Sequence, residues 1–194
     1  LGIEHPIIQG PFGGGLSSIQ LTVAVSEAGG LGSFGVHHLG PEDIEKVGRE
    51  LHAQTKKPFA LNLWVSNHDE GVAPLTSAEY ARAIEMFQPY YRQLDIEPPL
   101  QPARFGYSFE EQIEAVLDVK PAAFSFVYGI PSENILEECR RRNIVTIGTI
   151  TTIDEAIVME NAGVDLIVAT GFEAGGHRVS FLRSSEDEWT GTFA

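Results

Sequence analysis

The residue best suited to chemistry is His177, which stands in a glycine-rich stretch near the end of the 194-residue sequence. The stretch reads Thr170-Gly171-Phe172-Glu173-Ala174-Gly175-Gly176-His177-Arg178. It follows the apolar run 166–170, which is typical of a buried strand, and α/β proteins bind ligands at the carboxyl ends of their strands. An imidazole can exchange a proton near neutral pH. A surface-loop histidine is the alternative, but the glycines and the position after a strand favour a functional His177.

A second glycine-rich turn, Gln9–Gly15, comes at the end of the strand predicted over 7–9. Glycines without a Cβ allow a flat ligand to approach the backbone closely, although a flexible turn explains them equally well. Asn62 interrupts the apolar run 59–63, where its amide either bonds neighbouring backbone or reaches a ligand. Aromatic residues near strand ends, such as Trp64, are more often packing residues than pocket residues.

For the other polar candidates we favour structural interpretations over catalytic ones. His37 and His38 follow the run 32–35, but no carboxylate or further histidine stands at ligand spacing, so we expect a solvated loop and no metal site. The single cysteine, Cys139, lies in a helical pattern and is interpreted as a structural helix residue. The sequence contains no GxxxxGK[ST], HExxH, CxxC or GxSxG motif, which weighs against the chemistries that those motifs carry.

Short apolar runs alternate with helical patterns along the chain. Strands are predicted over 7–9, 32–35, 59–63, 122–127, 144–150 and 166–170. Helices are predicted over 17–28, 41–53, 77–92, 109–118, 133–142 and 154–162. This alternation indicates an α/β protein with a parallel sheet, either a doubly wound open sheet or a (β/α)8 TIM barrel. The proline-rich segment 66–108 breaks the rhythm and is interpreted as an insertion or a lid.

Composition excludes some classes of partner. Thirteen Lys and Arg against 27 Asp and Glu give a net charge of −14, which disfavours binding to nucleic acid or to an anionic membrane surface. Backbone amides at helix starts can still hold a phosphate. No run is long enough to span a membrane, and the single cysteine suits a reducing compartment. We therefore expect a cytoplasmic protein.

Three segments carry a resemblance to a known family. HisProIleIleGlnGlyProPhe at 5–12, SerGluAlaGlyGlyLeuGly at 26–32 and AlaThrGlyPheGluAlaGlyGlyHisArg at 169–178 resemble the nitronate monooxygenases, formerly called 2-nitropropane dioxygenases. The GluAlaGlyGlyHis element also occurs in the related FMN-dependent enoyl-acyl-carrier-protein reductases. The resemblance implies a (β/α)8 barrel with a small lid domain and a non-covalent FMN cofactor. The implied activity is oxidation of alkyl nitronates or nitroalkanes by O2 to a carbonyl compound and nitrite.

The resemblance also assigns roles to individual residues. It implies that His177 faces the substrate over the flavin, as the base for neutral nitroalkanes or as the group that holds the nitro group of a nitronate. The implied cofactor-binding residues are Gly10, Pro11, Phe12, Asn62, Thr170, Gly171, Gly175 and Gly176. Many family members have methionine where Phe12 stands, a difference that should change packing more than chemistry.

The resemblance places the FMN phosphate on loops after strands seven and eight, whereas the sequence supplies six β/α units. We therefore expect residues 1–194 to be the N-terminal part of a single FMN-binding barrel domain, an incomplete barrel with an insertion at 66–108. An FMN-dependent enoyl-acyl-carrier-protein reductase, which would use NAD(P)H, is the rival enzyme. A non-catalytic fragment that binds a flavin or a partner is the rival of another class. A homodimer is expected on general frequency alone.

Overall fold

The computed structural model describes residues 1–13, 15–65, 75–184 and 189–193. The strands in this part are β1 (Gly32–Gly35), β2 (Phe59–Trp64), β3 (Ala123–Val127), β4 (Val145–Ile150) and β5 (Leu166–Ala169). The helices are α1 (Ile19–Glu27), α2 (Pro41–Gln54), α3 (Ser77–Leu94), α4 (Phe109–Val119), α5 (Glu133–Arg142) and α6 (Ile153–Asn161). Apart from the first predicted strand, these bounds confirm the predicted elements to within two residues at each end.

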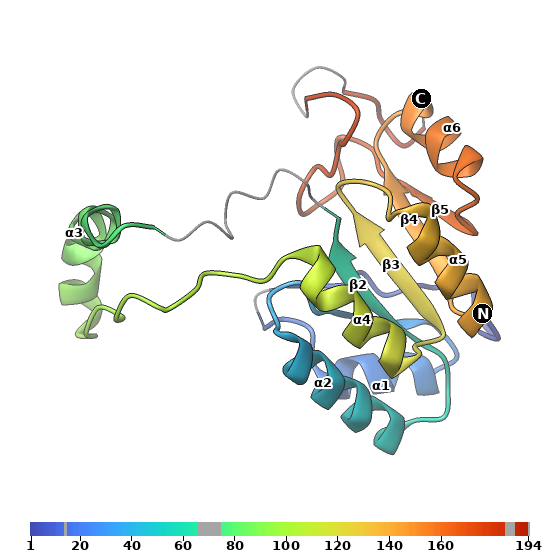
Figure 1. Cartoon of the computed structure of the whole chain (residues 1–194), viewed down its shortest axis with the longest axis horizontal. Coiled ribbons are helices and arrows are strands. Elements are labelled where there is room, and N and C mark those ends of the chain that lie inside the picture. Colours follow the sequence, from blue (N-terminus) through green and yellow to red (C-terminus); the bar gives the residue numbers. More distant parts are fainter. Residues whose placement is uncertain (14, 66–74, 185–188, 194) are drawn as a thin grey trace.

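The strands form one parallel sheet in sequence order, β1-β2-β3-β4-β5 (Figure 1). A doubly wound sheet reverses its strand order at a switch point, and the described strands show no such reversal. The helices follow the same order, with α1 against α2, α2 against α4 and α4 against α5. This arrangement is an α/β fold with a five-stranded parallel sheet, and it agrees with the barrel alternative over the residues that the structure covers.

The first predicted strand, 7–9, is reduced to a single parallel bridge between Ile8 and Leu31. Two backbone hydrogen bonds of 2.9 and 3.0 Å join this segment to Leu31. Pro6 and Pro11 flank it, and proline has no N–H with which to extend a ladder. The segment nevertheless lies beside β1, where a first barrel strand would lie.

The two faces of the sheet carry different side chains. Alternate strand residues pack with the helices in one large core, including Leu61 and Leu63 of β2 and Phe124 and Phe126 of β3. The opposite face has a separate small cluster of Leu31, Ala60, Ala123 and Ile147. Side chains alternate across a strand, so the sequence pattern itself separates a helix face from an inner face.

Local signals explain where the helices begin. Pro41 stands at the first position of α2, where its fixed φ suits a helix and its missing N–H is not needed. Thr152 caps α6 by accepting a hydrogen bond from the Glu155 N–H, the role for which threonine is favoured before a helix. Ser132 stands at the same position before α5, but its hydroxyl makes no capping hydrogen bond.

Helix α3 stands apart from the sheet (Figure 1). None of its residues is buried. Helix α3 contacts the segment that follows it, since the Tyr80 hydroxyl donates to the Pro99 carbonyl at 2.9 Å. Residues 66–74 of the predicted insertion lie outside the described residues, and a lid role for the segment stays a prediction. Within the described chain, no helix is both long and apolar enough to cross a bilayer.

The single cysteine gives a test of the helix-side core. Cys139 of α5 is fully buried, and burial raises the pKa of its thiol to about 11, with a smaller effect of the Asp165 carboxylate. The thiolate is the reactive form, so at pH 8 labelling of the folded protein should be at least about 100-fold slower than labelling of the urea-unfolded chain. The rate of modification by a chromogenic disulfide measures this. Equal rates in the two states would contradict the packing of α5 described here.

Candidate active site

The inner face of the sheet changes from apolar to polar toward the carboxyl ends of the strands. Ala60 and Ala123 pair in register and belong to the small apolar cluster. Two residues further along, Asn62 pairs with Ser125, and the Asn62 amide donates to the Ser125 hydroxyl at 3.0 Å. Asn62 is only 4% exposed, so this hydrogen bond fixes its amide in a buried position. The sheet therefore presents an oriented amide just below its carboxyl edge.

Four rings meet at that edge, one from the end of β2 and three from the loops that follow β1, β3 and β5. His37 follows β1 and stacks on Trp64, the last residue of β2, with ring centroids 4.1 Å apart and planes at 8°. The His177 ring lies edge-on to Trp64 at 5.2 Å, and Tyr128, which follows β3, lies 5.1 Å from Trp64. Because the strands are parallel, residues that follow their carboxyl ends converge although the chain separates them widely.

This cluster changes the interpretation of His37. The sequence predicts a solvated loop there, whereas the structure places the imidazole half-buried against Trp64. The reason is the length of β2, which carries Trp64 up to the level of the turn after β1. Trp64 also contacts His177, the histidine that the sequence singles out. Within the described residues, no three His, Cys, Asp or Glu side chains gather as a metal site.

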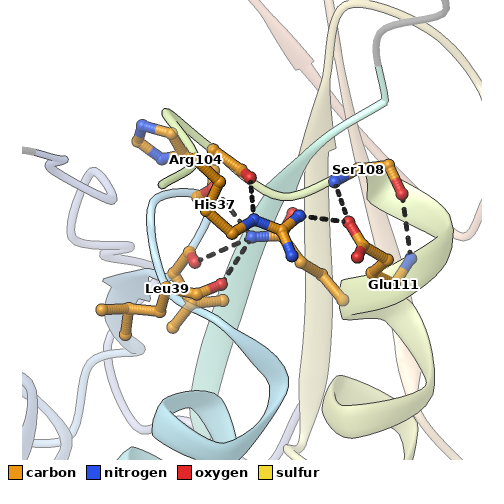
Figure 2. A network of polar contacts seen from close by, with 8 residues as sticks. His37, Leu39, Arg104, Ser108 and Glu111 are labelled. Carbon is orange, nitrogen blue, oxygen red and sulfur yellow. Dashed lines mark hydrogen bonds and ion pairs between the residues drawn. The ribbon is translucent and has the colours of Figure 1, made fainter. Parts of the chain in front are cut away.

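A buried glutamine holds the turn that carries His37. Gln112 of α4 is 2% exposed, and its Nε2 donates to the backbone carbonyls of His37 and Leu39, both at 2.8 Å. Figure 2 shows the two carbonyls pointing to the same nitrogen. Within the turn the Leu39 N–H pairs only with the Val36 carbonyl, and the glutamine N–H groups satisfy the carbonyls of His37 and Leu39.

Charged residues secure the start of α4 beside this turn. Arg104 donates to the Glu111 carboxylate at 2.8 Å, and the Ser108 N–H donates to the same oxygen at 2.8 Å (Figure 2). The hydrogen bond from Arg104 lowers the pKa of Glu111, and the reverse effect raises the pKa of Arg104. The guanidinium also lies 3.9 Å from the centre of the Tyr107 ring. These contacts fix where Gln112 enters the site.

The glycine-rich turn after residue 9 is fastened to β1. The Gln9 amide donates to the Ser33 carbonyl at 3.0 Å, and the buried Ser17 hydroxyl accepts from the Phe12 N–H at 3.0 Å. A Cβ on Gly13 would lie 2.4 Å from the His37 ring, so only glycine allows the turn this close to the imidazole. The turn therefore closes one side of the ring cluster.

The predicted cofactor residues on this turn lie in different surroundings. Gly10 has no close neighbour where a Cβ would stand, Pro11 is half-buried, and the Phe12 side chain is half exposed. Gly10 therefore offers the open backbone that a flat ligand needs.

The loop after β5 also divides into two parts. The Thr170 hydroxyl and N–H both bond the Ile150 carbonyl at 3.0 Å, which fixes the start of the loop. Gly171 is buried, and a Cβ there would lie 2.4 Å from the Thr192 nitrogen, so this glycine serves the packing of the chain. Around Gly175 and Gly176, by contrast, no atom lies within 4 Å of a Cβ position. The glycines next to His177 thus border open space.

The site residues that sequence reasoning missed are Gln112 and Glu155, both buried polar residues on helices. A signal for Gln112 existed, because it interrupts the apolar pattern of 109–118 on the face that Ile113, Val116 and Leu117 bury. No comparable signal marks Glu155, since an acidic residue in the first turn of a helix is common.

The residues present fit a flat, polar-edged ring such as a flavin. The glycine backbones at Gly10, Gly175 and Gly176 leave room that side chains would fill. The Asn62 amide supplies a hydrogen-bonding group below, and the His177 imidazole is exposed to the same edge. The set combines open backbone, one oriented amide and one proton-exchanging group, which suits a cofactor-dependent reaction of a small molecule.

The Gln112 contacts predict a measurable loss of stability. Gln112→Leu leaves two carbonyls without their donor, and the free energy of unfolding should fall by about 2 kcal/mol. Urea denaturation measures this. The matched control is Gln54→Leu at the exposed end of α2, which should stay within about 0.5 kcal/mol of the parent protein. An equal effect of the two substitutions would show that Gln112 does not hold the turn.

Comparison with known proteins shows the family of the chain. The family model described as nitronate monooxygenase matches residues 1–194. A nitronate monooxygenase of Paraburkholderia phytofirmans is 37% identical over 197 residues, covering 100% of this chain and 52% of the relative. A probable nitronate monooxygenase of Staphylococcus haemolyticus is 35% identical over 185 residues, covering 95% of this chain and 50% of the relative.

Solved structures agree with the sequence comparison. A nitroalkane oxidase from Streptomyces ansochromogenes superposes with a TM-score of 0.77 at 30% identity, covering 96% of this chain and 52% of that one. FabK from Thermotoga maritima, at 24% identity and a TM-score of 0.64, shares the fold. The chain thus spans about half the length of the proteins that it matches. The match along all of its residues shows that the chain belongs to the nitronate monooxygenase family.

Proposed function

We propose that this protein is an FMN-dependent oxidoreductase that converts nitronates and nitroalkanes, with O2, to a carbonyl compound and nitrite. The observation that carries the proposal is the position of His177. Its imidazole lies at the carboxyl edge of the parallel sheet, against Trp64 and next to the open glycines Gly175 and Gly176. Membership of the family and the likeness to a nitroalkane oxidase support this chemistry.

The proposal assigns the flavin to the space bordered by the glycine turns. Gly10, Pro11 and Phe12 would flank one side of the ring. Thr170 and Gly171 would line the cofactor, Gly175 and Gly176 would give it room, and Asn62 would face its polar edge. When bound, FMN supplies the electron acceptor that the oxidation requires and that no protein side chain provides.

The proposal includes a closed (β/α)8 barrel as the setting of the site. Leu166, Ile167 and Val168 of β5 are each 39% exposed, and within the described residues no strand pairs with the far side of β5. A further parallel strand would cover this apolar edge. In the resemblance stated above, strands beyond β5 also carry the loops that hold the FMN phosphate.

His177 and its neighbours have distinct proposed roles. With a neutral nitroalkane, His177 accepts the proton from the carbon that bears the nitro group, which leaves the nitronate anion. With a preformed nitronate, the same imidazole donates a hydrogen bond to a nitro oxygen. The stacked rings of His37 and Trp64 hold the imidazole in place and exclude water from one side.

His177→Ala tests the proposed base. Turnover of neutral nitroethane should fall roughly 10²- to 10⁴-fold, because proton abstraction loses its acceptor, while turnover of preformed ethylnitronate should fall much less. Flavin absorbance should be retained, since the side chain is not needed to hold the ring. Steady-state kinetics with both substrates and a visible spectrum measure these effects.

The control for this experiment is His5→Ala, at an exposed histidine beside Gly29, on the amino side of the sheet. This variant should keep parental activity. Full nitroethane activity in His177→Ala would refute the proposed role, and failure of the parent protein to take up FMN would refute the proposed cofactor. Turnover of NADH with an enoyl thioester in place of nitroalkane oxidation would favour the reductase alternative.

Trp64→Ala tests whether the indole borders the proposed substrate site. Removal of the indole deletes the stack with His37 and the edge contact with His177, and each aromatic contact is worth about 0.5–1.5 kcal/mol. We expect kcat/KM for nitroethane to fall about tenfold. The loss for 1-nitrohexane should be smaller, because the alanine variant leaves more room for a longer alkyl chain. Trp64→Phe, which keeps a ring, should retain most of the activity. The same loss for both chain lengths would contradict a role of Trp64 in shaping the pocket.

A further inference from the structure

A buried carboxylate that the proposed chemistry does not use lies near the loop of His177. Glu155 occupies the first turn of α6 and is only 1% exposed. Its backbone N–H is bonded by the Thr152 cap at 3.2 Å, so the start of the helix fixes its position. A carboxylate is rarely buried unless hydrogen-bond donors surround it, and the identity of these donors indicates what Glu155 does.

The two oxygens of Glu155 bind two different segments of the chain. Oε2 accepts from the N–H and the hydroxyl of Thr151, at 2.7 and 2.9 Å. Oε1 accepts from the backbone N–H groups of Phe181 and Leu182, at 2.6 and 3.1 Å. One side chain therefore joins the residue that follows β4 to the segment that follows His177.

A hydroxyl pair extends this junction toward the histidine. The Thr151 hydroxyl donates a hydrogen bond to the Glu155 carboxylate, and its oxygen lies 2.8 Å from the Ser180 hydroxyl oxygen. A hydroxyl has one proton, so Ser180 donates to Thr151. Ser180 stands three residues beyond His177, and Val179 between them is buried. The network thus ends three residues along the chain from the proposed base.

The segment needs such an anchor because it has no secondary structure of its own. Residues 170–184 contain neither helix nor strand, so no ladder holds them in place. Thr170 is bonded to the Ile150 carbonyl at one end, and Glu155 binds the other end at Phe181 and Leu182. His177 lies between these two fixed points, and its own side chain is exposed.

We infer that Glu155 is a positioning residue that holds the His177 loop in its working geometry without touching the substrate. This inference rests on the proposed function for its link to catalysis. A displacement of about 1 Å at a reacting group can cost about 100-fold in rate, so a fixed loop matters as much as the imidazole itself. The carboxylate suits the task because each oxygen serves one of the two segments.

Glu155→Gln is the informative variant, because an amide has one accepting oxygen where the carboxylate has two. Either the Thr151 pair or the Phe181 and Leu182 pair then faces an NH2 group that cannot accept. The FMN-loaded variant should lose 10- to 100-fold in kcat for neutral nitroethane, with KM little changed and a smaller loss for preformed ethylnitronate. Glu160→Gln makes the same change at an exposed position of α6 and should match the parent protein.

A double-mutant cycle separates positioning from a general structural loss. In the His177→Ala background, Glu155→Gln should cause no further loss of nitroethane turnover, because the positioned group is already gone. If the two losses instead multiply, Glu155 acts independently of His177 and the inference is overturned.

Backbone hydrogen exchange in the protein without FMN gives a readout independent of activity. The amides of 178–184 should exchange at least tenfold faster in Glu155→Gln than in the parent or in Glu160→Gln, while those of β2 and β3 stay unchanged. Unchanged exchange at 178–184 overturns the inference. This readout decides on the anchor even if the parent oxidises no nitroalkane, a result that would refute the proposed function instead.

A second variant keeps the test decisive if Glu155→Gln fails to fold. Ser180→Ala leaves the carboxylate in place and removes only the donor to Thr151. It should produce the same changes in exchange and nitroethane turnover at a smaller size, about threefold to tenfold. Parental values for both measurements in Ser180→Ala would overturn the inference.

Discussion

The candidate site depends on one constraint, the parallel pairing of five strands in sequence order. Each strand returns through a helix before the next begins, so every carboxyl end reaches the same edge of the sheet. The turns that follow β1, β3 and β5 are therefore neighbours although they are far apart in the chain. His37, Tyr128 and His177 meet around Trp64 for this reason.

The same constraint leaves the connecting turns without partners for their backbone groups. Strand ladders stop at the sheet edge, and the irregular turns beyond must find donors and acceptors elsewhere. Two buried side chains of the helix layer supply them. Gln112 donates to the carbonyls of the His37 turn, and Glu155 accepts from the N–H groups that follow His177. The helices thus support the site as well as cover the sheet.

The inner face of the sheet borders the space beside these turns. Large side chains such as Phe124 and Phe126 point to the helices, whereas Ala60 and Ala123 point inward. Leu31 and Ile147 complete this small inner cluster, and the Asn62–Ser125 pair adds polarity just below the edge. An apolar surface with a few oriented hydrogen-bonding groups at its edge suits a flat cofactor.

The sequence by itself determined the elements and the family. Signals such as Pro41, the Thr152 cap and the apolar run 59–63 are local, so they indicate bounds without knowledge of the fold. The motif around His177 likewise identifies the family, which the family model confirms. Tertiary structure alone decided that His37 stacks on Trp64, and that Gln112 and Glu155 support the loops. These features depend on which distant segments meet, and no local pattern of residue types encodes that.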